Sequence, residues 1–72
     1  MSGLCIIDVS GDFQETVTQL KKVKGVKDSF IVYGGHDVVA LLNAKDLNEV
    51  REVVFDIRKV PGVLRTETLI EV

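Results

Sequence analysis

The chain has 72 residues, of which 46% are hydrophobic, with one cysteine, one histidine and a formal net charge of −2. One cysteine allows no intrachain disulfide, and one histidine argues against a zinc site, so we expect neither a metal nor another cofactor. The negative charge argues against direct nucleic-acid binding, and no apolar run approaches the roughly 18–20 residues of a membrane span. A domain this small is marginally stable alone, which favours a partner subunit. The free cysteine and the lack of a basic leader favour the cytoplasm.

The first third of the chain predicts a strand followed by a helix. Residues 4–9 are almost continuously apolar and β-branched, which is typical of a central strand buried on both faces. Asp12 and Glu15 have capping-box spacing at the start of a helix that Gly25 ends. Its buried face is expected to contain Phe13, Val17, Leu20 and Val23. Its last turn is expected to carry Lys21, Lys22 and Lys24.

The middle of the chain predicts a β-hairpin. Residues 26–33 form a strand with polar residues near its start, which suits the edge of a sheet. Residues 38–42 are purely aliphatic and suit a central strand. The break between the two strands is Gly34-Gly35-His36-Asp37, which indicates a tight turn in which glycine permits a positive φ.

The last third predicts a second helix and a final strand. Asp46 and Glu49 again have capping-box spacing, and Pro61-Gly62 ends the helix. The buried stripe of this helix is expected to contain Leu47, Val50, Val54 and Ile57. Polar and apolar residues alternate over residues 63–72, as in a strand with two different faces.

An internal repeat supports one fold for the whole chain. Val23-Lys24-Gly25-Val26 resembles Val60-Pro61-Gly62-Val63 at an offset of 62 − 25 = 37 residues. The order βαββαβ with two such halves predicts a single α+β domain over residues 1–72, a ferredoxin-like sandwich. Its four-stranded antiparallel sheet would carry both helices on one face. The other face would be bare and apolar, which predicts a homodimer formed by packing two such faces together.

Catalytic chemistry has little support in this sequence. Cys5 lies in an apolar strand, where a thiol is usually inert packing, and no base accompanies it. His36 is the only histidine and is expected to face solvent in the turn. The acidic residues cluster at helix starts, where capping explains them. We therefore predict that the protein is not an enzyme; an enzyme subunit of this fold would need a pH–rate profile that depends on His36.

Small-molecule binding fits the remaining polar residues better. The Gly34-Gly35-His36-Asp37 turn offers amide N–H groups and one carboxylate, and Thr66 and Thr68 present hydroxyls on one face of the last strand. Acceptors for an ammonium group and donors for a carboxylate are what a zwitterionic ligand needs. This pattern indicates an amino acid or a similar small molecule as the ligand.

Three motifs occur together and in the same order as in a known family: Tyr33-Gly34-Gly35-His36-Asp37, Val60-Pro61-Gly62-Val63 and Arg65-Thr66-Glu67-Thr68. The chain resembles the effector-binding (RAM) domain of the Lrp/AsnC, or feast/famine, transcription regulators from residue 4 to residue 72. The resemblance implies a ferredoxin-like fold, dimers formed through the sheets, and rings of dimers. It also implies that an amino acid or related molecule binds between dimers of the ring.

The resemblance also assigns site residues. Gly35 and Asp37 match the glycine and the acidic residue of the family's hairpin, where Asp37 would hold the ligand ammonium or order the turn. Thr66 and Thr68 match its paired threonines. The flanking residues complete the expected ligand-binding set, which is Tyr33, Gly34, Gly35, His36, Asp37, Thr66 and Thr68; His36 is expected to tune ligand choice.

The chain departs from these regulators at its start, because it begins at the first strand with no helix-turn-helix domain ahead of it. A stand-alone effector module is therefore expected, which senses an amino acid itself or modulates full-length Lrp/AsnC relatives. The alternative is a co-assembly module without its own effector. An ACT-type amino-acid-binding domain shares the fold and ligand class, but the hairpin glycines and Thr66 with Thr68 favour the first family.

Overall fold

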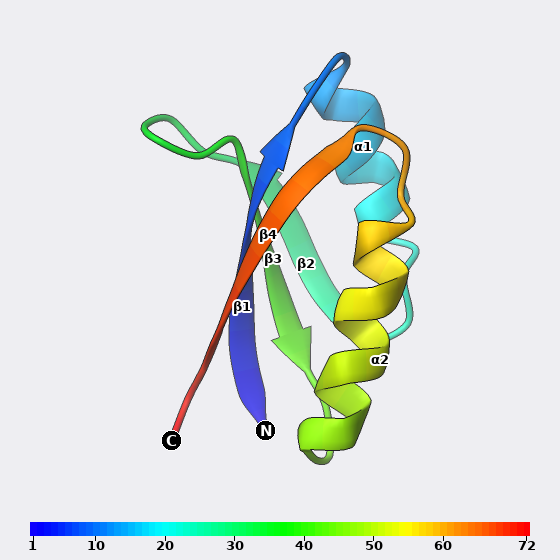
Figure 1. The fold of residues 1–72 in the computed structure, drawn as a ribbon, viewed down its shortest axis with the longest axis vertical. Helices are drawn as coiled ribbons and strands as arrows, with labels where there is room; N and C mark the ends of the chain where they lie inside the picture. Colours follow the sequence, from blue (N-terminus) through cyan, green and yellow to red (C-terminus); the bar gives the residue numbers. More distant parts are fainter.

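The computed structural model describes all 72 residues and contains six elements in the predicted order (Figure 1). These are β1 (Ser2–Val9), α1 (Phe13–Leu20), β2 (Val26–Ile31), β3 (Val38–Asn43), α2 (Leu47–Arg58) and β4 (Val63–Ile70). Neither helix is long and apolar enough to cross a membrane. The βαββαβ arrangement expected from the sequence is confirmed.

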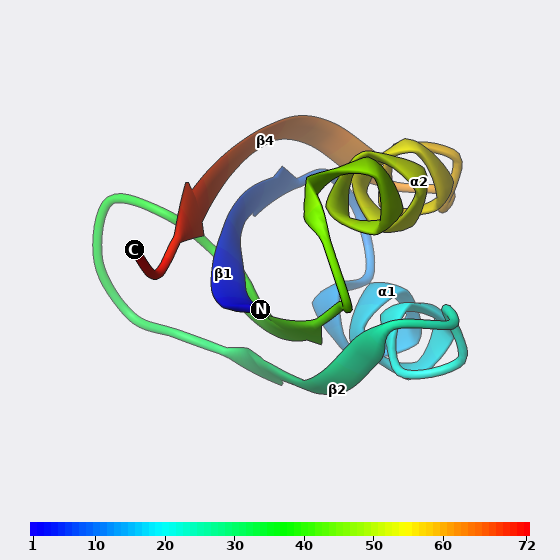
Figure 2. The same cartoon turned by 90° about the horizontal axis from the view of Figure 1, so that it is seen from below.

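The four strands form one antiparallel sheet in the order β2-β3-β1-β4. Strands β1 and β3 are central and β2 lies at an edge, as their composition predicted. Both helices cover the same face of the sheet, and the opposite face carries no helix (Figures 1 and 2). This is the ferredoxin-like α+β sandwich.

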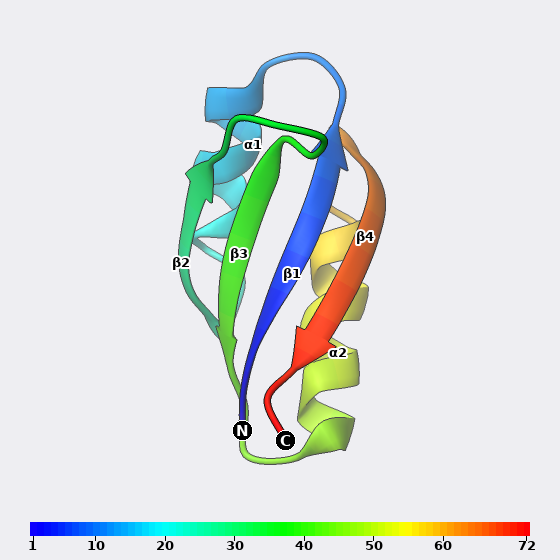
Figure 3. The same ribbon diagram turned by 90° about the vertical axis from the view of Figure 1, so that its left-hand side faces the viewer.

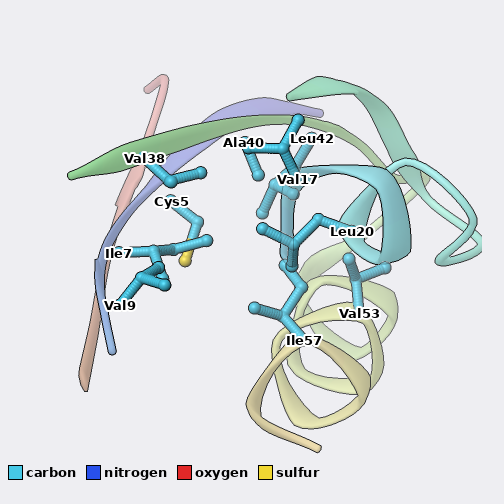
Figure 4. Packing of buried hydrophobic residues seen from close by; sticks show 10 residues of the cluster. All are labelled: Cys5, Ile7, Val9, Val17, Leu20, Val38, Ala40, Leu42, Val53 and Ile57. Carbon is cyan, nitrogen blue, oxygen red and sulfur yellow. The ribbon is translucent and has the colours of Figure 1, made fainter. Parts of the chain in front are cut away.

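The core lies between the sheet and the two helices. Figure 4 shows side chains from β1 and β3 pointing toward side chains from α1 and α2. Residues directly opposite in an antiparallel pair share one face, so the pairing of Cys5 with Ala40 and of Ile7 with Val38 builds this layer. The ten buried residues are Cys5, Ile7, Val9, Val17, Leu20, Val38, Ala40, Leu42, Val53 and Ile57. Each fully buried Ile, Leu or Val stabilises the fold by about 1.5–3 kcal/mol.

Helix starts agree with the sequence, but the first helix ends earlier than predicted. The Asp12 side chain accepts a hydrogen bond from the Glu15 amide at 3.1 Å, and that of Asp46 accepts one from the Glu49 amide at 2.9 Å. The placement of the three lysines in the last turn was wrong, because Leu20 is the last helical residue and Lys21 is already the C-cap. The chain leaves the helix through a tight turn in which the Val23 amide donates to the Leu20 carbonyl.

The buried stripe of α2 differs from the predicted one. Val53 is buried and Leu47 is half exposed, whereas Val50 and Ile57 are buried as expected. Leu47 is the first residue of the helix, and it lines a hollow with Ile70 of β4. Val53 is buried where Gly25 packs against it.

The internal repeat is a structural repeat. Gly25 and Gly62 both have φ near +96°, a left-handed conformation that favours glycine. A Cβ on Gly25 would lie 2.3 Å from a Val53 side-chain carbon, and one on Gly62 would lie 2.7 Å from the Thr16 hydroxyl oxygen. Thr16 and Val53 are themselves 53 − 16 = 37 residues apart. Each glycine therefore lets its loop pack closely onto the helix of the other half.

Both chain ends lie at the same end of the sheet, and the loop between β2 and β3 lies at the other end (Figures 1 and 3). The Glu71 amide donates to the Ser2 carbonyl at 2.9 Å, which holds the two ends side by side.

Candidate functional site

The loop between β2 and β3 is longer than the predicted tight turn. Strand β2 ends at Ile31, two residues before the predicted end at Tyr33, and β3 begins at Val38. The Val32 amide donates to the Asp37 carbonyl at 2.9 Å and closes the base of the loop. Residues 32–37, called the hairpin loop below, extend away from the helices (Figures 1 and 2) and lean toward β1 (Figure 3).

The tip of the hairpin loop is exposed and unsupported by side-chain packing. Tyr33 is wholly exposed to solvent. Gly34 has φ near +148°, so the expected positive φ occurs there. Gly35 has no positive φ, and a Cβ on it would meet no atom within 4 Å. The glycines therefore leave backbone N–H groups accessible at the tip.

Asp37 attaches the hairpin loop to the end of β1. Its carboxylate oxygen Oδ2 accepts a hydrogen bond from the Val9 amide at 2.9 Å, and its own amide donates to the Ile7 carbonyl at 3.2 Å. Of the two roles expected for Asp37, this geometry supports ordering of the turn. Contact of the second carboxylate oxygen with a ligand ammonium stays a prediction.

His36 is half exposed but does not simply face solvent. Its Nδ1 lies 3.0 Å from Oδ1 of Asp8, and the Arg65 guanidinium donates to the other oxygen of Asp8 at 2.8 and 3.0 Å. The hydrogen bonds from His36 and from Arg65 lower the pKa of the Asp8 carboxyl below its usual range. The hairpin loop, β1 and β4 thus meet at one carboxylate.

Thr66 and Thr68 face the helix side of the sheet. They pair with Ile7 and Cys5, which point into the core, so their side chains share that face. The Thr68 hydroxyl donates to Cys5 Sγ at 3.6 Å. Burial raises the pKa of the Cys5 thiol, so the thiolate is disfavoured, which supports the packing role expected for this residue.

Three hollows contain the predicted threonines. The first has a volume of about 380 Å³ and lies between α2 and β4, and we call it the α2–β4 groove. It is lined by Thr68 and Ile70 of β4 and by Leu47, Val50, Arg51, Val54, Phe55 and Arg58 of α2. The second, of about 370 Å³, is lined by Ile6, Asp8, His36, Arg65, Thr66 and Glu67. The third, of about 310 Å³, is lined by Arg58, Val63, Leu64, Arg65 and Thr66.

The structure brings some predicted site residues together and leaves others apart. His36 and Thr66 line one hollow, whereas Thr68 lines the α2–β4 groove with helix residues. Tyr33, Gly34 and Gly35 lie at the exposed loop tip, and the loop extends from the sheet on the side away from the helices. A ligand that touched the loop tip and Thr68 together would need the loop from another copy of the chain.

Sequence reasoning missed Asp8, Arg58 and Phe55. Asp8 had a signal, because it is the only charged residue in the apolar run of residues 4–9. Arg58 and Phe55 had none, because they lie outside the predicted stripe of the helix. No group of three or more His, Cys, Asp or Glu side chains gathers to hold a metal ion.

The strand order, the shared helix face and the exposed glycine loop define a small ferredoxin-like domain with open hollows beside its edge strand. The family model described as the Lrp/AsnC ligand binding domain matches residues 4–72. The chain therefore belongs to this family, as its three motifs predicted. No curated protein sequence matches the chain.

Solved structures share the fold over nearly the full chain. A protein from Thermus thermophilus is 33% identical with a TM-score of 0.87, covering 94% of this chain and 88% of that one. A hypothetical protein from Pyrococcus horikoshii is 23% identical with a TM-score of 0.87, covering 99% and 88%. A transcriptional regulator from Neisseria meningitidis, solved as a complex with L-Met, is 15% identical with a TM-score of 0.81. That match covers 94% of this chain but 47% of the regulator.

Proposed function

We propose that this domain binds an amino acid or a similar small molecule where two copies of the chain meet, and that the protein is a cytoplasmic, non-enzymatic sensor. The match of residues 4–72 to a ligand-binding domain family carries the proposal. The Neisseria regulator, a protein of the same fold, was solved with L-Met bound. An amino acid is therefore the first ligand class to test.

The α2–β4 groove and the hairpin loop have complementary chemistry for such a ligand. The groove offers apolar side chains from both elements, together with the Thr68 hydroxyl and the Arg58 guanidinium. The loop tip offers the amide groups of Gly34 and Gly35. Pockets that combine an apolar lining with a few convergent polar groups are typical of small-molecule sites. The loop of one copy, placed over the groove of another, would supply donors for the ligand carboxylate.

Assembly is the second part of the proposal. The uncovered face of the sheet carries the apolar side chains of Leu4, Ile6, Phe30, Val39, Leu41 and Leu69, which we call the open-face patch. Their placement follows from the strand register, because each pairs with a member of the same set or lies between two of the buried residues. Large uncovered apolar patches mark association surfaces. We propose that this patch forms the homodimer and that dimers join into a ring through the loop and the groove.

The decisive experiment is a thermal-shift screen of the purified protein against all twenty amino acids at millimolar concentration. A ligand at about one hundred times its Kd adds roughly 2.7 kcal/mol of stability. In a domain this small, that raises Tm by about 10 °C or more, at roughly 4–8 °C per kcal/mol. Light scattering on the same samples reports whether binding changes the oligomer size.

A matched variant identifies the site. Thr68→Val keeps the shape of the side chain and removes its hydroxyl, so we expect a weaker shift with the active amino acid and an unchanged oligomer. Thr18→Val is the control, because Thr18 lies on the exposed face of α1, outside the groove. A shift in Thr68→Val equal to that of the unmodified protein would remove Thr68 from the site.

One observation favours a second candidate function. The Asp37 and His36 side chains are already bonded within the chain, to the Val9 amide and to Asp8, so the loop has fewer free polar groups than the sequence indicated. The alternative is a co-assembly module that joins full-length Lrp/AsnC regulators without an effector of its own. A flat amino-acid panel from a well-folded oligomer would favour this alternative, and co-purification with a regulator of the family would then test it.

A further inference from the structure

The carboxylate of Asp8 connects three elements of the fold, which are β1, the hairpin loop and β4. Asp8 lies near the end of β1, and its side chain is only 18% exposed. Its Oδ1 contacts Nδ1 of His36 in the hairpin loop at 3.0 Å. Its Oδ2 accepts two hydrogen bonds from Arg65 of β4, from Nε at 3.0 Å and from an Nη at 2.8 Å. Both oxygens are thus occupied by cationic or imidazole donors from different elements.

The same end of β1 holds the loop at two further points. The Ile7 carbonyl accepts from the Asp37 amide, and the Val9 amide donates to the Asp37 carboxylate. Three consecutive residues of β1 therefore bind two consecutive residues of the loop. The contacts of Asp37 fix the base of the loop, and the contact of Asp8 with His36 fixes the residue next to the glycines.

Arg65 connects the Asp8 carboxylate to β4. It neighbours Thr66, and both residues line the hollow that also contains Asp8 and His36. A carboxylate held by Arg65 on one side and by His36 on the other sets the distance between the loop and this part of β4. Charge-assisted hydrogen bonds of this kind are shorter and stronger than neutral ones.

We infer that Asp8 is a positioning residue: its carboxylate holds the hairpin loop, through His36, in a fixed place relative to β4. The inference rests on the proposed function and extends it, because the loop is one of the two parts to which we assign ligand contact. Asp8 itself touches no ligand in this scheme.

Amide hydrogen exchange in the ligand-free protein tests the inference directly. The amides of Val9, Val32 and Asp37 all donate at the junction of loop and sheet, so their protection reports whether the loop is docked. In Asp8→Ala and in His36→Ala we expect these three amides to exchange at least fivefold faster. The Cys5 and Ala40 amides of the central strands should keep their rates, which shows that the fold is intact.

A double variant and a matched control make the test specific. Because both substitutions break the same contact, Asp8→Ala with His36→Ala should exchange no faster than the faster single variant. Glu67→Ala is the control, since Glu67 lines the same hollow and makes no hydrogen bond to Asp8. Unchanged protection of the three amides in Asp8→Ala and His36→Ala would overturn the inference, and so would equal loss in Glu67→Ala.

A conservative variant separates positioning from general stability. Asp8→Asn keeps a side-chain oxygen that can accept the hydrogen bond from His36, so the protection of the three amides should lie between that of Asp8→Ala and that of the unmodified protein. Protection in Asp8→Asn as low as in Asp8→Ala would overturn the inference.

The exchange experiment contains no ligand, so its outcome does not depend on the proposed function. A flat amino-acid panel with a docked, Asp8-dependent loop would refute ligand binding and leave the positioning role intact. A selective amino-acid response whose affinity is the same in Asp8→Ala would refute the link between loop position and binding.

Discussion

Gly25→Ala should destabilise the domain by more than an ordinary surface substitution, because two separate costs meet at this residue. Its φ near +96° lies in the left-handed region, where an L-residue costs about 1–2 kcal/mol. Its added Cβ would lie 2.3 Å from a methyl carbon of Val53, which is closer than real contacts allow. Forcing such extra volume into a packed site costs about 1–3 kcal/mol. Together these give a loss of about 2–5 kcal/mol.

The loss is large compared with the expected stability of the domain. At roughly 0.05–0.15 kcal/mol per residue, a chain of this length is stable by about 4–11 kcal/mol. Urea denaturation followed by circular dichroism, at one fixed protein concentration, measures the change. Fixed concentration matters because oligomer formation contributes to apparent stability.

Gly11→Ala is the matched control. Gly11 has a similar φ of +83°, but a Cβ on it would meet nothing within 4 Å, so this variant shows the conformational cost alone. In the background of Val53→Ala, Gly25→Ala should lose less stability than in the unmodified protein, since the methyl group in its way is gone. If Gly25→Ala and Gly11→Ala lost the same free energy of unfolding, the close packing of the loop on α2 would be refuted.

Four further predictions concern single side chains. Ser29→Ala should raise the free energy of unfolding by about 1 kcal/mol, because the Ser29 hydroxyl is buried without a partner; a lower Tm in calorimetry would contradict this. Asp37→Ala should cost about 1–3 kcal/mol in urea denaturation, because a partly buried amide of β1 loses its acceptor, and Asp37→Asn should cost less. Phe30→Glu should convert the proposed dimer to monomers in light scattering, and an unchanged mass would exclude the open-face patch as its interface. The lowered pKa of Asp8 means that its stabilising contribution is present above the ordinary carboxyl pKa and is lost as pH falls through the lowered value; in His36→Ala the pKa should rise in an NMR carboxyl titration, and no change would refute the contact.

The fold could be predicted from the sequence because local signals agreed with one another. Asp12 and Asp46 cap the two helices as their spacing indicated. The apolar character of residues 4–9 and 38–42 placed these strands at the centre of the sheet, and the 37-residue repeat fixed the topology. The prediction erred where packing between distant parts of the chain decides which side chains are buried. Val53 lies outside the predicted stripe, yet it is buried because Gly25, distant in sequence, packs on it. Strand β2 lies at the edge of the sheet as its polar residues indicated, yet the side chain of Ser29 in that strand is buried.

The candidate site was less predictable than the fold. The motif residues were found, but their directions depend on the strand register: Thr66 and Thr68 point to the helix side, while the loop extends from the other side. The role of Asp8 required the pairing of β1 with β4, which brings Arg65 opposite to it across 57 residues of sequence. A long-range pair of this kind leaves no periodic signal along the chain.

The positions of the two chain ends bear on how the domain can be attached to anything else. Both ends lie beside each other at one end of the sheet, and the hairpin loop lies at the opposite end (Figure 3). A biosensor surface, a fluorescent protein or a crystallisation partner joined at either terminus would therefore leave the loop pointing outward and uncovered. A short linker between residues 1 and 72, combined with a new opening elsewhere, would give a circularly permuted form with the same sheet. In such tethered and permuted forms, the experimenter could control how the hairpin loop of one copy meets a neighbouring copy.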